Sequence, residues 1–362
     1  MSNIKTKKRV VVAMSGGVDS SVAACLLKEQ GFEVIGITLQ LYSSNNKIKK
    51  SKTCCAGQDI YDAKEVARKI NINHYVLDYK KPFYDHVIKN FVESYKNGQT
   101  PIPCVQCNQY IKFSELLDVA KSLGANFLAT GHYIKSKLVG KEHGLFVAED
   151  SEKDQSYFLF QTRKKDLSFL KFPLGGINKQ ETRKLAEKYG IGIADKSESQ
   201  DICFIPDGNY RKFLTKYKGF GSNGNIVDVN GNILGKHSGI ENYTVGQRKK
   251  LNIFSESPMY VIKILKKENK VVVGNKEDLE EVDIDIDQFN WIGPGVPNKS
   301  DSISNLKIKV RARQKPVLGT LKLKDNSSAT IKLNSPALGI AKGQGCVFYS
   351  NENQLLGGGW II

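Results

Sequence analysis

The feature that most constrains the fold is a short apolar run followed by two glycines and an Asp-Ser pair, in residues 9–21, RVVVAMSGGVDSS. The β-branched run before the glycines is typical of a central strand that is buried on both faces. Gly16 and Gly17 let the backbone turn sharply and approach a ligand closely. Asp19 or Ser20 is then expected to cap a helix with one apolar stripe. A glycine loop that opens a helix gathers unpaired amide groups and the positive end of the helix dipole, so this stretch predicts a phosphate site.

Strands and helical stripes alternate over residues 9–205, which predicts an α/β domain with a doubly wound parallel sheet. The further strands are expected at 33–39, 73–77 and 126–130, and apolar residues at helical spacing occupy 60–70, 87–95 and 113–123. In such sheets ligands bind beyond the carboxyl ends of the strands. The glycine loop, Leu39, Gly131 and His132 all fall there.

Beyond Asp207 the pattern changes to short strands. Hairpins are expected at 225–235, around Asn230-Gly231, and at 259–274, around Glu268-Asn269. Further strands are expected at 306–313, 319–324, 329–333, 343–350 and 360–362, a density that suggests a small β-barrel. The chain is therefore divided into an α/β domain at 1–207 that carries the glycine loop, a small mixed central domain at 208–280 and a C-terminal β-barrel domain at 281–362.

Charge and composition indicate a partner. The 54 Lys and Arg residues exceed the 37 Asp and Glu residues, which gives a formal charge of +17. A polyanionic partner, most naturally nucleic acid, explains this excess, although a lysine-rich proteome gives the same number. No apolar run approaches membrane-spanning length and no secretory signal precedes the first strand, so a cytoplasmic protein without a membrane partner is expected. The lysine-rich segment 47–52 is expected to be a mobile loop.

Seven cysteines, an odd number, argue against a framework of structural disulfides in a cytoplasmic chain. Cys25 and Cys346 lie in apolar contexts and are assigned to the core. Cys104 and Cys107 form a C-x-x-C at the expected start of a helix, where a thiol is expected to have a lowered pKa. A zinc site is disfavoured because no second C-x-x-C is present and adjacent Cys54 and Cys55 cannot chelate with the usual geometry. Cys203, taken alone, is another core candidate.

The motifs together resemble a known family. The hexapeptide SGGVDS resembles the loop of the ATP-pyrophosphatase superfamily, and neither a G-x-x-x-x-G-K-[ST] loop nor a G-x-G-x-x-G after a strand competes with it. TPIPCVQCNQYIKF at 100–113, TGHY at 130–133, KDQSY at 153–157, FPLG at 172–175, SQDICFIP at 199–206 and YTVGQRK at 243–249 follow in order. This series is similar to the bacterial tRNA-specific 2-thiouridylases, the MnmA family, over nearly the whole chain.

The resemblance implies an enzyme, a tRNA-uridine 2-sulfurtransferase that uses ATP, with Mg²⁺, to place sulfur at C2 of the wobble uridine in glutamate, glutamine and lysine tRNAs. It implies Cys107 as nucleophile, Cys203 as persulfide carrier, and a partner protein that donates sulfur. The implied ATP-binding residues are Ala13, Met14, Ser15, Gly16, Gly17, Val18, Asp19, Ser20, Leu39 and Gly131. The implied tRNA-binding residues are Ile102, Pro103, Cys104, His132, Lys153, Asp154, Gln155, Arg311, Ala312 and Gln344.

Two positions depart from the family pattern. Cys104 stands where the family often has an Asp proposed as a general acid or base, and Ala312 stands where an aromatic residue is usual. His132 can be a base, an RNA contact or a polar residue that only ends a strand. Lys307, Lys309, Arg311 and Arg313 alternate with apolar residues, so one face of a barrel strand is expected to be basic and to touch tRNA, unless it is an ordinary solvated face.

Two other functions remain open at this point. An amide-forming synthetase would use the same ATP loop but would have no use for Cys107 and Cys203. A tRNA-binding protein with a relic ATP site would be expected to have a decayed loop, yet the hexapeptide is intact. The sulfur donor, the oligomeric state, the tRNA selectivity, the role of Cys104 and the species that attacks C2, either the persulfide or free hydrosulfide, cannot be read from the sequence.

Overall fold

The computed structural model describes residues 7–42, 57–193, 196, 202–205, 208–298 and 301–362. The lysine-rich segment 47–52, with Cys54 and Cys55, lies outside them. The described chain divides into two compact units, one of residues 1–87 with 104–208 and the other of residues 88–103 with 209–362. Because the second unit groups the central and barrel regions, domain boundaries at 207 and 280 stay a prediction.

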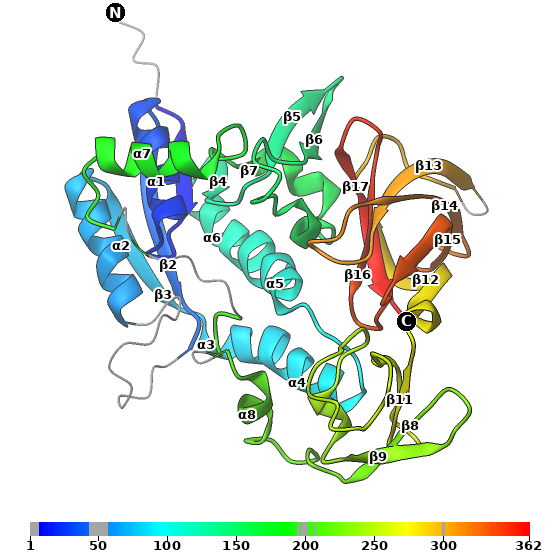
Figure 1. The fold of residues 1–362 in the computed structure, drawn as a ribbon. Helices are drawn as coiled ribbons and strands as arrows, with labels where there is room; N and C mark the ends of the chain where they lie inside the picture. The colour runs from blue at the N-terminus through cyan, green and yellow to red at the C-terminus, as the bar shows by residue number, and fades with distance from the viewer. Residues whose placement is uncertain (1–6, 43–56, 194–195, 197–201, 206–207, 299–300) are drawn as a thin grey trace, which may run out of the picture. The chain divides into compact units, whose positions relative to one another are not determined.

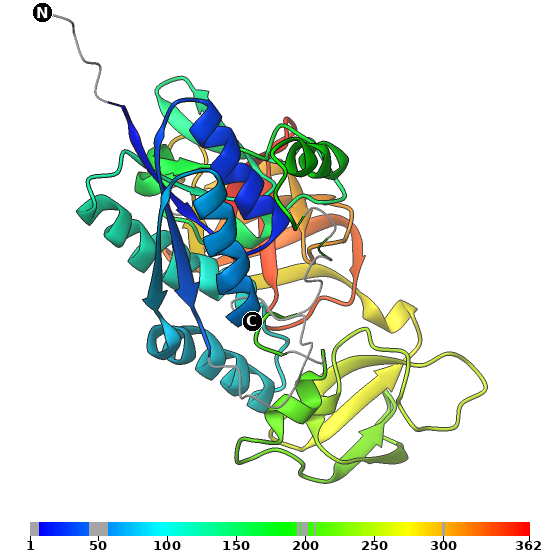
Figure 2. The same cartoon turned by 90° about the vertical axis from the view of Figure 1, so that its left-hand side faces the viewer.

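The first unit is built on a five-stranded parallel sheet in the order β3-β2-β1-β4-β7, as the alternating pattern predicted. Its strands are β1 (Arg9–Ala13), β2 (Glu33–Gln40), β3 (Asn73–Asp78), β4 (Phe127–Thr130) and the short β7 (Leu170–Lys171). The central strand β1 is buried on both faces, which explains its unbroken apolar run. Figures 1 and 2 show α1 (Val18–Glu29), α2 (Gly57–Lys69) and α7 (Lys179–Lys188) on one side of this sheet and α6 (Leu116–Ser122) on the other.

Other elements of this unit were missed or differ from the prediction. A hairpin of β5 (Lys135–Val139) and β6 (Glu142–Phe146) follows β4. The stretch after β3 forms α3 (Lys80–Phe83) and a π-helix, η1 (Tyr84–Ile88). The C-x-x-C segment forms α5 (Pro103–Gln106), which continues into a nine-residue π-helix, η2 (Cys107–Glu115), before α6. Two short 3-10 helices, η3 (Ser156–Leu159) and η4 (Lys164–Phe169), also lie in this unit, whereas α8 (Tyr210–Leu214) and the 3-10 helix η5 (Ile240–Asn242) belong to the second unit.

The second unit contains α4 (Lys89–Lys96), α8, a small sheet and a barrel. The small sheet has the order β10-β11-β8-β9, formed by β8 (Gly224–Val227), β9 (Ile233–His237), β10 (Tyr260–Leu265) and β11 (Lys270–Gly274). Both predicted hairpins are confirmed, because β8 pairs antiparallel with β9 and β10 pairs antiparallel with β11. Their turns place Gly231 and Asn269 at positive φ, as hairpin turns require.

The barrel is closed by six antiparallel strands, as expected. After the short η6 (Glu277–Leu279) come β12 (Glu280–Trp291), β13 (Ser302–Lys309), β14 (Val317–Leu323), β15 (Ala329–Leu338), β16 (Gly345–Tyr349) and β17 (Gln354–Ile361). The ring closes because β12 pairs with β15 on one edge and with β17 on the other. Buried apolar residues from all of these strands fill its interior. In the part of the chain that the structure describes, no helix is long and apolar enough to cross a membrane.

One predicted strand is too long. The basic row was expected to run from Lys307 to Arg313, but β13 ends at Lys309. Leu306 and Ile308 are buried while Lys307 and Lys309 are only half-buried, so the alternation holds within the strand. Beyond it the chain turns, and the Arg311 guanidinium donates to the carbonyl oxygens of Gly339 and Val245 at 2.6 and 2.8 Å. The basic face is therefore limited to the two lysines, because Arg311 turns away to bind backbone oxygens.

Candidate active site

The glycine loop links β1 to α1 and is closed by its own serines. The Ser20 hydroxyl accepts from the Ser15 amide at 3.1 Å and lies 3.2 Å from the Gly17 carbonyl oxygen, to which it can donate. The Ser21 hydroxyl donates to the same carbonyl at 2.9 Å. The expected cap is wrong: the helix begins at Val18 after Gly17, which has no side chain to cap it. Ser20 instead lies in the first turn and points back, so the loop is pinned from inside the helix.

Two glycines fit this turn for steric reasons. Gly16 has a φ of +74°, and a Cβ there would lie 2.1 Å from the backbone oxygen of Asp59 on α2. Gly131, which follows β4, would place a Cβ 2.7 Å from the Ser20 nitrogen. Neither position can hold a side chain unless the backbone moves. The glycine turn, α2 and the residue after β4 are therefore in close backbone contact around the start of α1.

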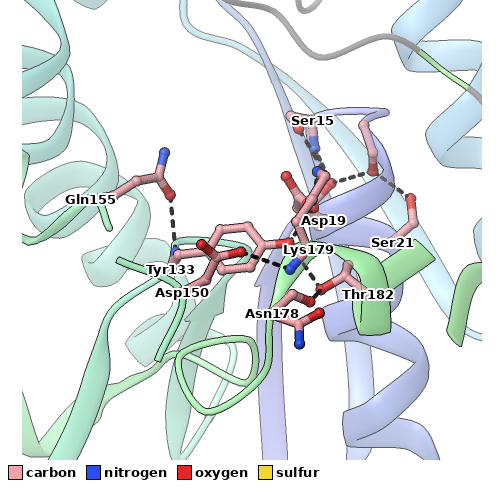
Figure 3. A network of polar contacts seen from close by, with 11 residues as sticks. Ser15, Asp19, Ser21, Tyr133, Asp150, Gln155, Asn178, Lys179 and Thr182 are labelled. Atoms are coloured by element: carbon pink, nitrogen blue, oxygen red, sulfur yellow. Dashed lines mark hydrogen bonds and ion pairs between the residues drawn. The ribbon is translucent and has the colours of Figure 1, made fainter. Parts of the chain in front are cut away.

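A network of polar side chains fixes Asp19 at one wall of the site (Figure 3). The Lys179 ammonium lies 2.7 Å from Asp19 Oδ1, and the Tyr133 hydroxyl donates to the same oxygen at 2.9 Å. Lys179 is the first residue of α7, whose start is held by a capping box between Asn178 and Glu181. The lysine side chain is only 10% exposed, whereas that of Asp19 is 33% exposed. The network thus fixes Asp19 through Oδ1, while a third of its side chain stays exposed.

A second lysine holds the loop from the other direction. The Lys196 ammonium donates to the Gly16 carbonyl oxygen at 2.9 Å and forms ion pairs with Asp59 at 2.6 Å and Asp62 at 2.5 Å. These two carboxylates come from α2, so Lys196 ties the glycine turn to that helix. They raise the pKa of Lys196 against the opposing effect of burial, so the lysine stays charged.

A cavity at the carboxyl ends of β1, β2 and β4 brings the main predicted residues together. Its walls are formed by Ala13, Met14, Ser15, Asp19, Ser20, Ile37, Leu39, Leu41, Cys107, Lys112, Thr130, Gly131, His132 and Gln155. Seven of the ten residues predicted to bind ATP line it, and Gly16, Gly17 and Val18 form the turn beside it. The predicted nucleophile Cys107 is in the same cavity as the loop.

The protonation of Cys107 differs from the expectation. Helix α5 begins at Pro103, so Cys107 is not at a free helix start, and it is buried. Burial raises the pKa of the Cys107 thiol, and the positive charge of Lys112 offsets part of that rise. The expected lowered pKa is therefore wrong for this thiol, because the cost of burying a thiolate exceeds the benefit from nearby charge.

His132 is held in a neutral state. Its Nδ1 lies 2.8 Å from the Thr130 hydroxyl, and its ring packs against Phe113 and Phe172. Burial, with the nearby charge of Lys112, holds the pKa of His132 well below its ordinary value. A neutral imidazole at this wall can bind a base or a sugar but is a weak proton acceptor at neutral pH.

Cys203 lies in the first unit on a segment that aromatic packing anchors. Its neighbours Phe204 and Ile205 are buried, and the Phe204 ring packs edge-on against Phe83 of α3 with ring centroids 5.7 Å apart. Cys203 itself is half-buried, and Cys104 is exposed. Residues 199–201 of the same motif lie outside the described residues. Cys25 and Cys346 are buried, and burial raises the pKa of Cys25 to about 11, which confirms them as core thiols.

The residues predicted to bind tRNA are in varied surroundings. Gln155 lines the cavity and accepts from the Tyr133 amide at 3.0 Å. The Asp154 carboxylate binds the amides of Ala148 and Ser156, so it shapes the loop that carries Lys153. In the other unit Ile102 and Pro103 are buried, Ala312 is half-buried, and Gln344 donates to the Thr100 carbonyl oxygen at 2.8 Å. Their contact with tRNA stays a prediction.

Several residues of the site were missed by sequence reasoning. Lys112 and Tyr133 stood inside motifs that were singled out, so their presence was visible and their roles were not. Lys179 and Lys196 carried no signal, because each is more than 150 residues from the loop atom that it binds. Among the described residues, no group of His, Cys, Asp and Glu side chains forms a metal site.

The fold and the site define a class of nucleotide-using enzyme. An α/β domain carries the pinned glycine loop and a cysteine in the same cavity, and two β regions follow it. Three family models match successive parts of the chain: a tRNA methyl transferase HUP domain matches residues 8–207, a tRNA methyl transferase PRC-barrel domain 211–275, and an aminomethyltransferase beta-barrel domain 281–361. Proteins named tRNA-specific 2-thiouridylase MnmA from Rickettsia felis and Orientia tsutsugamushi are each 49% identical over 365 aligned residues. These alignments cover 100% of this chain and 99% and 98% of the relatives. The chain belongs to the MnmA family of tRNA-specific 2-thiouridylases.

Solved structures add little. A 4-thiouridine synthetase in complex with RNA and bound ATP is 14% identical, covers 58% of this chain and 50% of its own, and has a TM-score of 0.35. An NMN synthetase from Francisella tularensis is 21% identical over 54% of this chain and 67% of its own, with a TM-score of 0.33. The assignment therefore rests on the sequence relatives and the site.

Proposed function

We propose that this protein replaces the C2 oxygen of the wobble uridine of tRNA with sulfur at the expense of ATP. The observation that carries the proposal is that the glycine loop and Cys107 line one cavity. The end-to-end match to the 2-thiouridylases supports it. The substrates are the glutamate, glutamine and lysine tRNAs, and the enzyme works in the cytoplasm.

The first step activates the uridine. Its C2 oxygen is a poor leaving group, so it attacks the α-phosphorus of ATP, the bond to the β-phosphate breaks, and pyrophosphate leaves with the electron pair. The uridine N3 proton passes to solvent. Amide groups at the start of α1 bind the phosphates, since a helix start with a glycine turn favours anions. Leu39 and Gly131 border the nucleotide.

Mg²⁺ fits the wall that Asp19 forms. Lys179 and Tyr133 both bind Oδ1, and the Asp19 side chain lines the cavity and is 33% exposed. One carboxylate oxygen together with ATP phosphates is a common environment for this ion. When bound, Mg²⁺ would neutralise charge on the phosphates.

Sulfur enters in the second step. Cys203 carries a persulfide, and its terminal sulfur, or hydrosulfide released from it, attacks C2 and expels AMP. Cys107 attacks the inner sulfur of Cys203, which leaves a Cys107–Cys203 disulfide and frees the transferred sulfur. An external thiol must then reduce this disulfide before the next turnover. A cysteine desulfurase or a sulfur-relay protein reloads Cys203.

Cys107 has to lose its proton to act. Burial keeps the thiol protonated in the resting cavity, which protects it from oxidation between turnovers. Cys104 is exposed at the start of α5 and stands where an acid is usual in the family, so it assists proton transfer only weakly. The large positive charge of the chain, Gln155 and His132 in the cavity, and Lys153 on the loop beside Gln155 guide the tRNA.

The test is mass analysis of the wobble nucleoside from tRNA incubated with the protein, ATP, magnesium and a sulfide source. The proposal predicts ATP-dependent gain of one sulfur and loss of one oxygen, and the Cys107→Ser variant is the matched control that gives none. The family-model descriptions name methyl transfer, so gain of one methyl group in place of the sulfur would favour that function instead.

A further inference from the structure

Lys112 is a cavity residue to which none of the preceding steps gives a role. Its side chain is half-buried and lines the cavity with Ser15 and Cys107. Its ammonium group forms no hydrogen bond or ion pair with the residues that the structure describes. Lys179 differs, since its charge is already compensated by Asp19.

An uncompensated ammonium group in a partly buried position costs free energy. The flanking residues Ile111 and Phe113 are 0% and 2% exposed, so the backbone at Lys112 is firmly packed. The lysine is therefore held by a rigid wall, and no carboxylate of the described residues is paired with it. Such an arrangement is typical of a site where a ligand supplies the opposite charge.

The π-helix explains why Lys112 and Cys107 share the cavity. Residues five apart on an α-helix point about 140° away from each other, because each residue turns by about 100°. In a π-helix the hydrogen bonds join residues five apart, which brings such residues closer to one face than in an α-helix. The Leu116 amide donates to the Ile111 carbonyl oxygen in this pattern at the end of η2. The helix type thus aims both side chains at one space.

The charge of Lys112 reaches two other residues of the cavity. It lowers the pKa of the Cys107 thiol, which burial raises, and it lowers the pKa of His132, which burial lowers as well. Within the described residues, burial and the charge of Lys112 are the causes of both pKa shifts. Lys112 is therefore placed to favour negative charge on Cys107 and on anything bound beside the glycine loop.

We propose that Lys112 is a catalytic residue whose ammonium group stabilises negative charge in this cavity, on the α-phosphate during adenylation and on the Cys107 sulfur during sulfur transfer. This rests on the proposed function. Lys112 transfers no proton in either step: the uridine oxygen gains its bond to phosphorus, and pyrophosphate carries away the electron pair. Its contribution is electrostatic.

The first experiment measures pyrophosphate release with tRNA and ATP in Lys112→Met, Lys112→Arg and Lys165→Met. Lys165→Met is the matched control, because it removes the same charge from an exposed lysine that does not line the cavity. Loss of one charge-stabilising group from an active site costs about 10²- to 10³-fold in kcat. We expect that loss in Lys112→Met, with a smaller change in KM for ATP, and at least partial rescue in Lys112→Arg. A rate for Lys112→Met equal to that of Lys165→Met overturns the phosphate role.

The second experiment needs neither ATP nor tRNA. The rate of Cys107 alkylation by iodoacetamide is followed by peptide mass analysis, which separates it from the exposed Cys104. Without the lysine charge the pKa of Cys107 rises and a smaller fraction of it is thiolate, so alkylation should be about tenfold slower in Lys112→Met for each unit by which the pKa rises. The Lys112→Arg and Lys165→Met variants should react at the wild-type rate. Equal rates in all variants overturn the sulfur role.

These two readouts separate failure of this inference from failure of the proposed function. A wild-type protein that forms no pyrophosphate with any tRNA contradicts the proposed function, while the alkylation rates still decide whether Lys112 acts on Cys107. Lys112→Arg, which keeps the charge, guards against a variant that merely fails to fold.

Discussion

Replacing Gly16 with alanine should disrupt the glycine loop far more than the same change at the other end of α1. Gly16 and Gly31 have φ of +74° and +85°, so alanine at either position carries the left-handed penalty of about 1–2 kcal/mol. A Cβ at Gly31 meets nothing within 4 Å, whereas at Gly16 it lies 2.1 Å from the Asp59 backbone oxygen. Real Cβ atoms essentially never approach within 3.0 Å, so loop and α2 must separate by about 1 Å. Overpacking of this kind adds about 1–3 kcal/mol.

The predicted destabilisation is therefore about 1–2 kcal/mol for Gly31→Ala and about 2–5 kcal/mol for Gly16→Ala. Urea unfolding followed by two probes can assign it. Both tryptophans, Trp291 and Trp360, belong to barrel strands, so their fluorescence reports on the barrel. Far-UV circular dichroism at helical wavelengths reports mainly on the α/β unit, which contains α1, α2, α6 and α7.

We expect Gly16→Ala to lower the midpoint of the circular dichroism transition more than Gly31→Ala does, while neither variant moves the fluorescence transition. Gly16→Ala should also lose pyrophosphate release, because the loop amides move. Coincident circular dichroism transitions for the two variants would refute the steric reasoning.

Three further predictions follow from the site and the barrel. Asp19→Ala should abolish AMP and pyrophosphate formation while tRNA binding, measured by filter retention, stays nearly intact; unchanged pyrophosphate release would remove the loop from the mechanism. Changing Lys307 and Lys309 together to Gln should lower the salt slope of tRNA binding by about 1.4 on the single-strand scale. An unaltered slope would make that face an ordinary solvated one. Arg311→Gln should instead lower the urea midpoint of the fluorescence transition, since its carbonyl contacts are internal. Burial lowers the pKa of His74, His132 and His237 from 6.5, so the unfolded chain binds protons more readily than the folded chain. The stability that these residues contribute above about pH 6.5 should therefore be lost as the pH falls below it. Urea midpoints that stay constant from about pH 8 to about pH 5 would contradict this.

Local patterns were enough to predict the framework. The apolar run of β1, the glycine turn and the alternating stripes indicated the parallel sheet, and Asn230-Gly231 located a hairpin, because each of these depends on a few adjacent residues. Because parallel strands place their carboxyl ends at one edge of the sheet, Ser15, Leu39 and Gly131 were predicted to lie close together. The structure brings them to one cavity.

The remaining features depend on contacts that no local pattern encodes. The predicted basic strand face ends at Lys309 because Arg311 binds the backbone oxygens of Val245 and Gly339, which are distant in sequence. The pKa of Cys107 was predicted in the wrong direction because burial by the surrounding fold dominates it. The partnership of Cys107 with Lys112 requires a π-helix, and a helical stripe at ordinary spacing gives no sign of one.

The measurement that tests the central claim most directly is single-turnover trapping with Cys203 preloaded as persulfide. Protein, ATP and substrate tRNA are mixed, the reaction is stopped with an alkylating agent, and disulfide-linked peptides are identified by mass. The account predicts a Cys107–Cys203 disulfide that appears in step with the thiolated nucleoside, and no product when Cys107 is alkylated beforehand. A Cys104–Cys107 disulfide, with Cys203→Ser still active, would contradict it.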